Sequence, residues 1–262
     1  MQLKRTWSGK NGKETAFTVQ DSPMKAIEMD FLNLCDGQSV SYDEKDREFA
    51  LILLGGKCTV QGKEFRFEKI GERATPFDGK PVTAFIGANT PFSVMGEGDV
   101  RIAVCKSPAK KTYPPRLIGA NEVREKKLGK GAFERLAYFN LDETVPAEAL
   151  YIGEFLVSDG RWASFPPHKH DVDNMPAEGK LEEVYYFEFD KPAGFGVQMV
   201  YDREGEFDLA YRVQSGDMVL IPKGYHPCAV APGYTEYCLW VMAGKDRGLF
   251  SSMAPEHAWI VK

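Results

Sequence analysis

Several features that define whole classes of protein are scarce or missing in this 262-residue sequence. No segment approaches the ~18 consecutive apolar residues of a membrane helix, and the N-terminus lacks the apolar core of a signal peptide. We therefore expect a cytoplasmic protein with no membrane partner. No long run of Lys or Arg occurs and the net charge is −5, so nucleic acid is not expected as a partner either. The five cysteines include no C-x-x-C pair, which indicates reduced core residues.

Helical periodicity is also scarce, whereas short β-branched and aromatic segments bounded by turn residues are common. Residues 121–127 are the clearest place for a turn or a short helix. Regularly spaced strands predict an all-β protein built as an antiparallel sandwich or barrel. The expected strands are residues 48–54, 60–67, 81–85, 100–105, 151–157, 183–189, 197–201, 207–213, 217–221 and 237–242.

The two halves of the sequence resemble each other. Residues 82–105 align without gaps on residues 218–241, and Thr90 falls opposite His226. Upstream, residues 48–56 align on residues 183–191 after a slip of one residue. We interpret this as an internal duplication with a charged linker. It predicts two domains, residues 1–120 and residues 121–262.

Histidine is rare, and three of the four histidines stand in two motifs of the second half. His168 and His170 are two apart, so on a strand they point to the same side. His226 follows a turn at the end of another expected strand. Three imidazoles and a carboxylate from the pair Glu182 and Glu183 would suit a divalent ion such as Zn²⁺, Mn²⁺, Fe²⁺ or Ni²⁺. His257 is not part of such a motif and is not expected to be a ligand.

These motifs carry a resemblance to the cupin superfamily, and within it to the 5-deoxy-glucuronate isomerase family of myo-inositol catabolism. The similar segments are SFPPHKHDVDNMP, LEEVYYF, PAGFGVQMVY and GDMVLIPKGYHP. The resemblance implies a bicupin, two jelly-roll (double-stranded β-helix) barrels of which only the second binds metal. It also implies the ligands His168, His170, Glu183 and His226. The twelve residues 171–182 exceed the usual superfamily spacing and are expected to form a loop over the barrel mouth.

The resemblance implies the isomerisation of a uronic acid, 5-deoxy-glucuronate, to 2-deoxy-5-keto-gluconate. A proton moves between adjacent carbons, so a base must lie within hydrogen-bond reach, while a metal ion stabilises the oxyanion and no redox cofactor is needed. The sequence does not identify the base, and its candidates, in order, are Tyr185, Tyr225, Asp171 and Asp173.

A fixed cation would match the carboxylate of such a substrate. Lys223, beside the metal turn, is the first candidate, and Arg161 and Arg212 are weaker ones. Gln198 could bind a substrate hydroxyl if its side chain points inward.

Two other functions use the same fold. A cupin dioxygenase has a similar ligand set, and fold and ligands alone do not choose the reaction. A non-catalytic sugar-binding cupin would be expected to carry a DNA-binding helix-turn-helix, and none is visible. The sequence is compatible with a homo-oligomer, in which the first half could serve as an assembly surface or as a cover for the second barrel.

Overall fold

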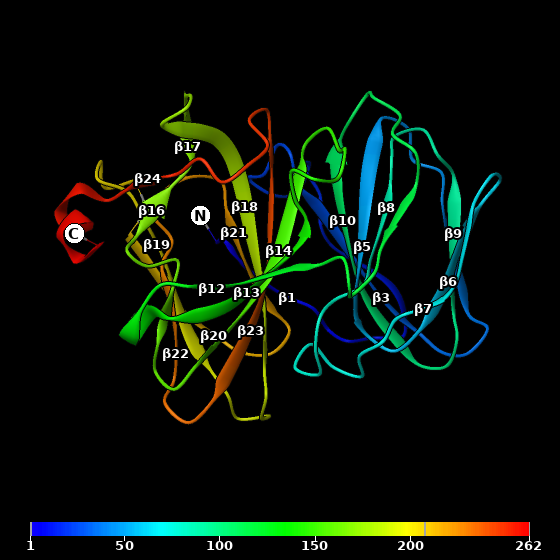
Figure 1. The fold of residues 1–262 in the computed structure, drawn as a ribbon, viewed down its shortest axis with the longest axis horizontal. Helices are drawn as coiled ribbons and strands as arrows, with labels where there is room; N and C mark the ends of the chain where they lie inside the picture. Colours follow the sequence, from blue (N-terminus) through cyan, green and yellow to red (C-terminus); the bar gives the residue numbers. More distant parts are fainter. Residues whose placement is uncertain (1, 207, 262) are drawn as a thin grey trace.

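A computed structural model describes residues 2–206 and 208–261, and these form an all-β protein of two similar halves (Figure 1). In each half a larger sheet faces a smaller one, and together they make a barrel, as the sequence predicted. Within the described residues, four of the five cysteines are buried and none is paired. No helix in that part of the chain is long and apolar enough to cross a membrane.

The first half is built from a six-stranded and a four-stranded sheet. The six-stranded sheet has the order β11 (Arg116–Ile118), β8 (Thr83–Ile86), β5 (Arg47–Gly55), β10 (Val100–Pro108), β3 (Glu28–Leu34) and β2 (Gly12–Phe17). The four-stranded sheet has the order β4 (Ser39–Tyr42), β9 (Phe92–Gly96), β6 (Cys58–Gly62) and β7 (Arg66–Ile70).

The second half contains the largest sheet. Its order is β1 (Lys4–Thr6), β21 (Asp217–Ile221), β18 (Glu178–Phe189), β23 (Thr235–Gly244), β14 (Leu150–Ser158), β13 (Arg135–Leu141) and β12 (Arg124–Leu128), with β17 (Asp171–Asn174) also paired to β18. The facing sheet consists of β15 (Trp162–Ala163), β22 (Cys228–Val230), β19 (Gly196–Tyr201) and β20 (Asp208–Val213). The remaining elements are the pair β16 (His168–Lys169) and β24 (Ser252–Met253) and two 3₁₀ helices, η1 (Gly131–Phe133) and η2 (Pro255–Val261).

The strand order repeats between the halves. The run β8-β5-β10-β3-β2 in the first half corresponds to β21-β18-β23-β14-β13 in the second. The smaller sheets correspond in the same way, β4-β9-β6-β7 to β15-β22-β19-β20. The ungapped alignment of the two halves also brings the starts of β9 and β22 opposite each other. Sequence and topology therefore agree on a duplication.

The two large sheets pack against each other between the barrels (Figure 1). Successive strand residues point to opposite faces, so one face of β18 carries Glu183 and Tyr185 into its own barrel while the other carries Tyr186 toward the first half. The Tyr186 ring lies 4.8 Å from that of Phe31 in β3. A single apolar cluster joins both sheets, whereas a second cluster fills the first barrel alone. The first half thus covers the back of the sheet that carries the predicted ligands.

The first strand of the chain crosses to the other half. β1 pairs with β21, so residues 4–6 lie in the sheet of the second barrel although the predicted division assigns residues 1–120 to the first. Strand pairing otherwise separates the halves between β11 and β12. A domain boundary at residue 120 remains a prediction.

Three local expectations need correction. Residues 60–67, expected as one strand, belong to β6 and β7, joined by a turn that the hydrogen bond from Gly62 N to Phe65 O (3.0 Å) closes. The stretch 121–127 begins with the expected turn, which the hydrogen bond from Glu122 N to Gly119 O (2.9 Å) closes, but from Arg124 it continues as strand β12 because of its pairing with β13. The insertion 171–182 forms a hairpin of β17 with the start of β18 instead of a loop. The expected strand 207–213 is observed as β20 from Asp208, and Phe207 lies outside the described residues.

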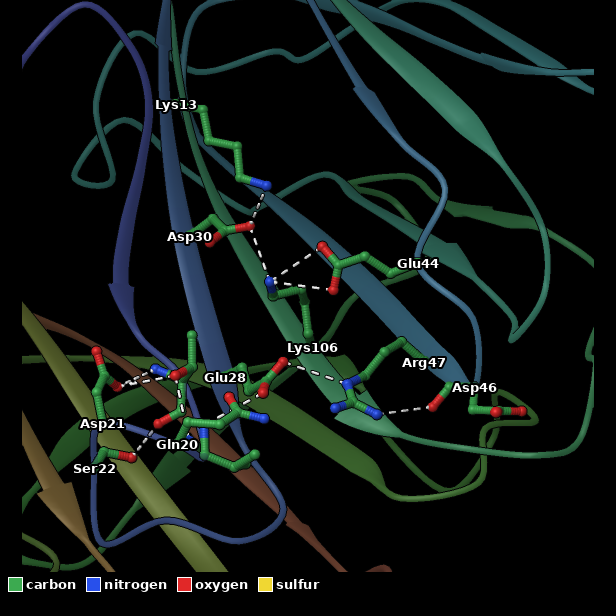
Figure 2. Close-up of polar contacts among 12 residues, drawn as sticks. Lys13, Gln20, Asp21, Ser22, Glu28, Asp30, Glu44, Asp46, Arg47 and Lys106 are labelled. Carbon is green, nitrogen blue, oxygen red and sulfur yellow. Dashed lines mark hydrogen bonds and ion pairs between the residues drawn. The ribbon is translucent and has the colours of Figure 1, made fainter.

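Ion pairs occupy part of the first barrel (Figure 2). Asp30 is fully buried, and its Oδ2 lies 3.2 Å from Lys13 Nζ and 3.1 Å from Lys106 Nζ. Lys106 also contacts Glu44 at 3.3 Å. Continuing the alignment of the halves by one residue sets Lys106 opposite Met242, which lines the cavity of the second barrel. Side chains of different chemistry therefore occupy equivalent parts of the two barrels.

Candidate metal centre and its cavity

A tight turn after β21 sets the position of His226. Gly224 in this turn has φ +96°, and a Cβ there would lie 2.7 Å from the carbonyl oxygen of Tyr201, so only glycine fits. The backbone oxygen of His226 accepts a hydrogen bond of 2.8 Å from Gln198 Nε2. The His226 side chain is fully buried and cannot turn to solvent.

The pair His168 and His170 lies at the short strand β16, which ends at Lys169. β16 pairs with β24 from the C-terminal segment, with His168 opposite Met253. The two imidazoles still point the same way, because backbone alternation continues through His170. Their ring centroids lie 4.9 Å and 5.1 Å from that of His226, respectively.

Glu183 on β18 lies between two of these imidazoles. Its Oε2 is 3.0 Å from His170 Nε2 and 2.9 Å from His226 Nε2. Ligand atoms of these three buried residues all lie within 4.8 Å of one another. His168 is next to this cluster and does not meet the same distance limit.

The donor set of this cluster fits a cation. His170 Nδ1 lies 3.2 Å from the Leu181 carbonyl oxygen and His226 Nδ1 lies 2.9 Å from that of Gly224. Carbonyl oxygens only accept hydrogen bonds, so each Nδ1 carries a proton and each neutral ring presents a lone pair at Nε2. Both Nε2 atoms face a carboxylate oxygen, and the buried His226 Nε2 makes no well-aligned hydrogen bond within the described chain. A divalent ion can bind both of these lone pairs and the Glu183 carboxylate at once.

The electrostatics of the cluster favour an ionised carboxylate between the imidazoles. Burial opposes ionisation of Glu183, but its close contacts with the imidazoles of His170 and His226 outweigh burial and lower the pKa of Glu183 to about 2. Burial, with repulsion from the neighbouring histidines, lowers the pKa of His168 to about 3. Burial likewise disfavours charge on His170, yet the bond to Glu183 raises the pKa of His170. Protons therefore compete with a metal for this site as pH falls.

A cavity of about 300 Å³ opens onto the cluster. His168, His170, Glu183 and Tyr185 form part of its lining, and its polar side chains include Arg135, Ser164 and Ser251. Ser164 Oγ and the Tyr185 hydroxyl are joined by a short hydrogen bond. The other walls are mainly apolar, from Phe139, Phe155, Phe165, Trp240, Met242, Leu249 and Phe250. Such a lining, with a few convergent polar groups, is typical of a small-molecule site.

Of the candidate bases, Tyr185 lies in the cavity and three others lie elsewhere. The Tyr225 ring packs against that of Tyr201, with 5.4 Å between the ring centroids, and lines a different depression with mostly polar residues. Asp171 pairs with Lys169 and accepts a hydrogen bond from Gly224 N. Asp173 is exposed and pairs with Lys245 at 3.0 Å. Burial holds the pKa of Tyr185 well above its usual value, so its hydroxyl carries a proton at neutral pH.

The side chains proposed to bind the carboxylate and a hydroxyl do not reach this cavity. Lys223 is partly exposed and pairs with Glu206. Arg212 stacks on Phe195 at 5.2 Å, and Arg161 does not line the cavity. Gln198 is buried, but its amide donates to backbone oxygens, including that of His226.

Glu182, the competing carboxylate, faces the first half. It accepts hydrogen bonds from the backbone N–H groups of Lys25 and Ala26. Successive side chains of β18 point to opposite faces of the sheet, so Glu182 points away from the imidazoles and Glu183 points toward them.

Sequence reasoning missed three polar residues of the cavity, Arg135, Ser164 and Ser251. Arg135 lies on β13 and Ser164 immediately follows β15. Ser164 has φ +51°, a conformation uncommon outside glycine and frequent at functional sites. For Arg135, the available signal was a single cation at the start of the strand RLAYFNL. The sequence alone does not distinguish such a cation from an ordinary charged residue on the protein surface.

The two barrels and the His–Glu–His cluster define a bicupin with a candidate metal site. Comparison with solved structures agrees: oxalate decarboxylase from Lactobacillus farciminis superposes with a TM-score of 0.70 at 13% identity, covering 100% of this chain and 90% of that chain. This likeness shows the fold alone. An IolB-like protein from Salmonella typhimurium LT2 superposes with a TM-score of 0.96 at 33% identity and 100% coverage of both chains.

Sequence comparison gives the family. Residues 3–260 match the model of the KduI/IolB family, and the chain belongs to that family. A curated relative from Geobacillus kaustophilus, named 5-deoxy-glucuronate isomerase, is 42% identical over 87% of this chain and 83% of its own length. One of the same name from Bacillus subtilis strain 168 is 36% identical over 94% of this chain and 91% of its own length.

Proposed function

We propose that the protein is an aldose–ketose isomerase that converts 5-deoxy-glucuronate to 2-deoxy-5-keto-gluconate in inositol catabolism. The observation that carries this proposal is the 42% identity, over most of both chains, to a relative named 5-deoxy-glucuronate isomerase. The cavity supports it, because a small polar molecule needs an enclosed site with few, convergent polar groups. The likeness to oxalate decarboxylase concerns the fold and does not favour oxygen chemistry.

His168, His170, Glu183 and His226 are the proposed ligands of a divalent metal, with Zn, Mn, Fe and Ni as the ions that suit this donor set. The support is the convergence of three of these side chains within 4.8 Å and the ring contact of the fourth with His226. When bound, the ion would act as a Lewis acid at the substrate carbonyl and the neighbouring hydroxyl.

The isomerisation moves one proton from C2 of the aldose to C1 and another between the two oxygens, with no net oxidation. We propose that the hydroxyls of Tyr185 and Ser164 exchange the proton that moves between the two substrate oxygens. They are hydrogen-bonded to each other and lie beside the ligand cluster. A donor there stabilises negative charge as it develops on an enediolate oxygen. The aromatic walls exclude water, which strengthens this hydrogen bond and suppresses side reactions.

The decisive experiment is conversion of 5-deoxy-glucuronate by purified protein without oxygen, followed by NMR. Isomerisation with bound metal, by elemental analysis, and with no oxygen uptake in air is the expected result. Substrate-dependent oxygen consumption by an iron-containing protein would identify a dioxygenase instead. Selective sugar binding with no turnover would identify a binding protein.

A further inference from the structure

Among the described residues, the cationic side chain of Arg135 in the second barrel has no acidic partner. Arg135 begins β13, where alternate residues Arg135, Ala137 and Phe139 all line the cavity. The adjacent β14 contributes Phe155 to the same wall, with Ala137 as its cross-strand partner. Arg135 thus belongs to the sheet face that also carries Glu183 and Tyr185, not to the solvent surface.

The guanidinium of Arg135 is short of hydrogen-bond partners. In the described chain its side chain makes one hydrogen bond, Nη1 to the Phe133 carbonyl oxygen at 3.3 Å, and it forms no salt bridge. Arg73, which is buried in the described structure, instead makes two bonds of 2.8 Å to the Glu154 carboxylate. Burial lowers the pKa of Arg135, and the nearby Tyr185 and Cys228 offset this effect only in part. A partly buried charge without a carboxylate partner is costly, and proteins keep such a cost where a ligand completes the site.

We propose that Arg135 binds the carboxylate of the substrate through a bidentate ion pair and so makes the cavity specific for sugar acids. This inference rests on the proposed function for the identity of the substrate. Arg135 is the sole Lys or Arg among the cavity-lining residues of the described chain. The guanidinium of Arg135 holds its five N–H donors in one plane and can donate two parallel hydrogen bonds to a carboxylate. The ammonium group of Lys223, the first candidate from the sequence, lacks this geometry.

The chemistry of the substrate places two different demands on one cavity. The aldehyde and its neighbouring hydroxyl react at one end of a six-carbon chain, and the carboxylate stands at the other end and takes no part in bond making. The ligand cluster offers donors to the reacting end. Arg135 holds the far end, so its binding energy orients the reacting carbons and raises the rate as well as the affinity.

The test uses full-length, metal-loaded protein and a pair of probes, glucuronate and glucuronamide, that differ only in charge at the far end. Calorimetry should show that the wild type prefers glucuronate and that Arg135→Met binds it about 100-fold more weakly. Binding of glucuronamide should change by less than about threefold. Arg135→Lys should recover part of the preference, since it retains the charge without the planar fork.

Arg212→Met is the matched control, because Arg212 is also an arginine of the second half but lies outside the cavity. It should bind both probes as the wild type does. Metal content and near-UV circular dichroism of Arg135→Met should equal those of the wild type, which shows that the fold and the ligand cluster are intact. The assignment of Arg135 would be overturned if Arg135→Met lost affinity equally for both probes, or if its preference for glucuronate were unchanged.

The same measurements separate this inference from the proposed function. If the wild type binds glucuronate through Arg135 but does not isomerise 5-deoxy-glucuronate, the isomerase proposal fails and the carboxylate site stands. If the wild type isomerises the substrate and Arg135→Met does so with unchanged kcat/KM, the carboxylate site fails and the isomerase proposal stands.

Discussion

At the residue scale, Glu183 and His226 carry the ligand cluster, since their contact of 2.9 Å joins β18 to the turn after β21. We expect Glu183→Ala and His226→Ala each to weaken metal binding by about 100-fold or more, because each removes a ligand from a site that the remaining donors hold poorly. Elemental analysis after dialysis measures the loss. Activity should fall with it.

His257→Ala is the control for these two variants. His257 is the one histidine that is not a proposed ligand, and it lies in η2 with its ring 6.4 Å from that of Phe165. Its replacement should leave the metal content unchanged. Full metal content in dialysed Glu183→Ala or His226→Ala protein would contradict the ligand assignment.

Glu236 predicts a pH dependence of stability that has no connection with the metal. The side chain is fully buried, its Oε2 has no hydrogen-bond partner in the described structure, and burial raises its pKa from 4.5 to about 8. Between these values the unfolded chain loses a proton that the folded chain keeps. The contribution of Glu236 to stability is therefore full below about pH 4.5 and is lost as pH rises toward 8.

Glu236→Gln removes this titration and nearly preserves the shape of the side chain. In urea unfolding at pH 5 and pH 8, the free energy of unfolding should fall less with pH for the variant than for the wild type. The difference should be on the order of a few kcal/mol. Parallel pH profiles would show that Glu236 is ionised in the folded protein.

At the scale of elements, the short pair β16 and β24 links the C-terminal segment to the ligands. His168 pairs with Met253, and Ala254 N donates to the Pro167 carbonyl oxygen at 2.8 Å. The same segment supplies Leu249, Phe250 and Met253 to the cavity wall. Truncation after Gly244 should leave the barrels folded but lower metal affinity and kcat/KM by about tenfold or more, because His168 loses its support.

Truncation after Ala254 is the matched comparison, because it removes η2 and retains β24. Its metal affinity should stay within about twofold of the wild type. Both truncated proteins should show a cooperative thermal transition. Equal metal affinity in the two would mean that β24 does not orient His168.

At the scale of the whole molecule, the halves are joined by polar as well as apolar contacts. Arg73 of the first half and Glu154 of β14 form a buried ion pair at 2.8 Å. Glu48 also accepts hydrogen bonds of 2.8 Å from the backbone N–H groups of Ala149 and Leu150. The first half therefore fixes β14, a strand of the ligand-bearing sheet, from behind.

Breaking the ion pair should destabilise the entire chain. We expect Arg73→Met to lower the free energy of unfolding by about 3–5 kcal/mol, because the buried Glu154 loses its counter-ion and keeps only the hydrogen bond from Asn140 Nδ2. Urea unfolding measures the change. Arg73→Met combined with Glu154→Gln should recover a large part of the loss, and equal stability of the single and double variants would show that the unpaired charge is not the cause.

Much of the fold could be predicted because strand patterns are local. Residues 151–157 and 217–221 show the alternation or apolar run that their burial requires, and the structure has strands there. The strand β12 could not be predicted, since it is highly exposed and owes its conformation to β13. The spacing of His168 and His170 indicated a shared direction, but not that β24 would hold them.

The sequence by itself determined the all-β class, the duplication and the histidines of the candidate ligand cluster, because strand periodicity and motif spacing are properties of the chain itself. Only the tertiary structure decided which cations and hydroxyls meet those ligands. Arg135 and Ser164 share their cavity, while Lys223, three residues before His226, points elsewhere. The reason is physical: a site forms where the inward faces of separate strands converge, and pairing between distant segments, not distance along the chain, selects those faces.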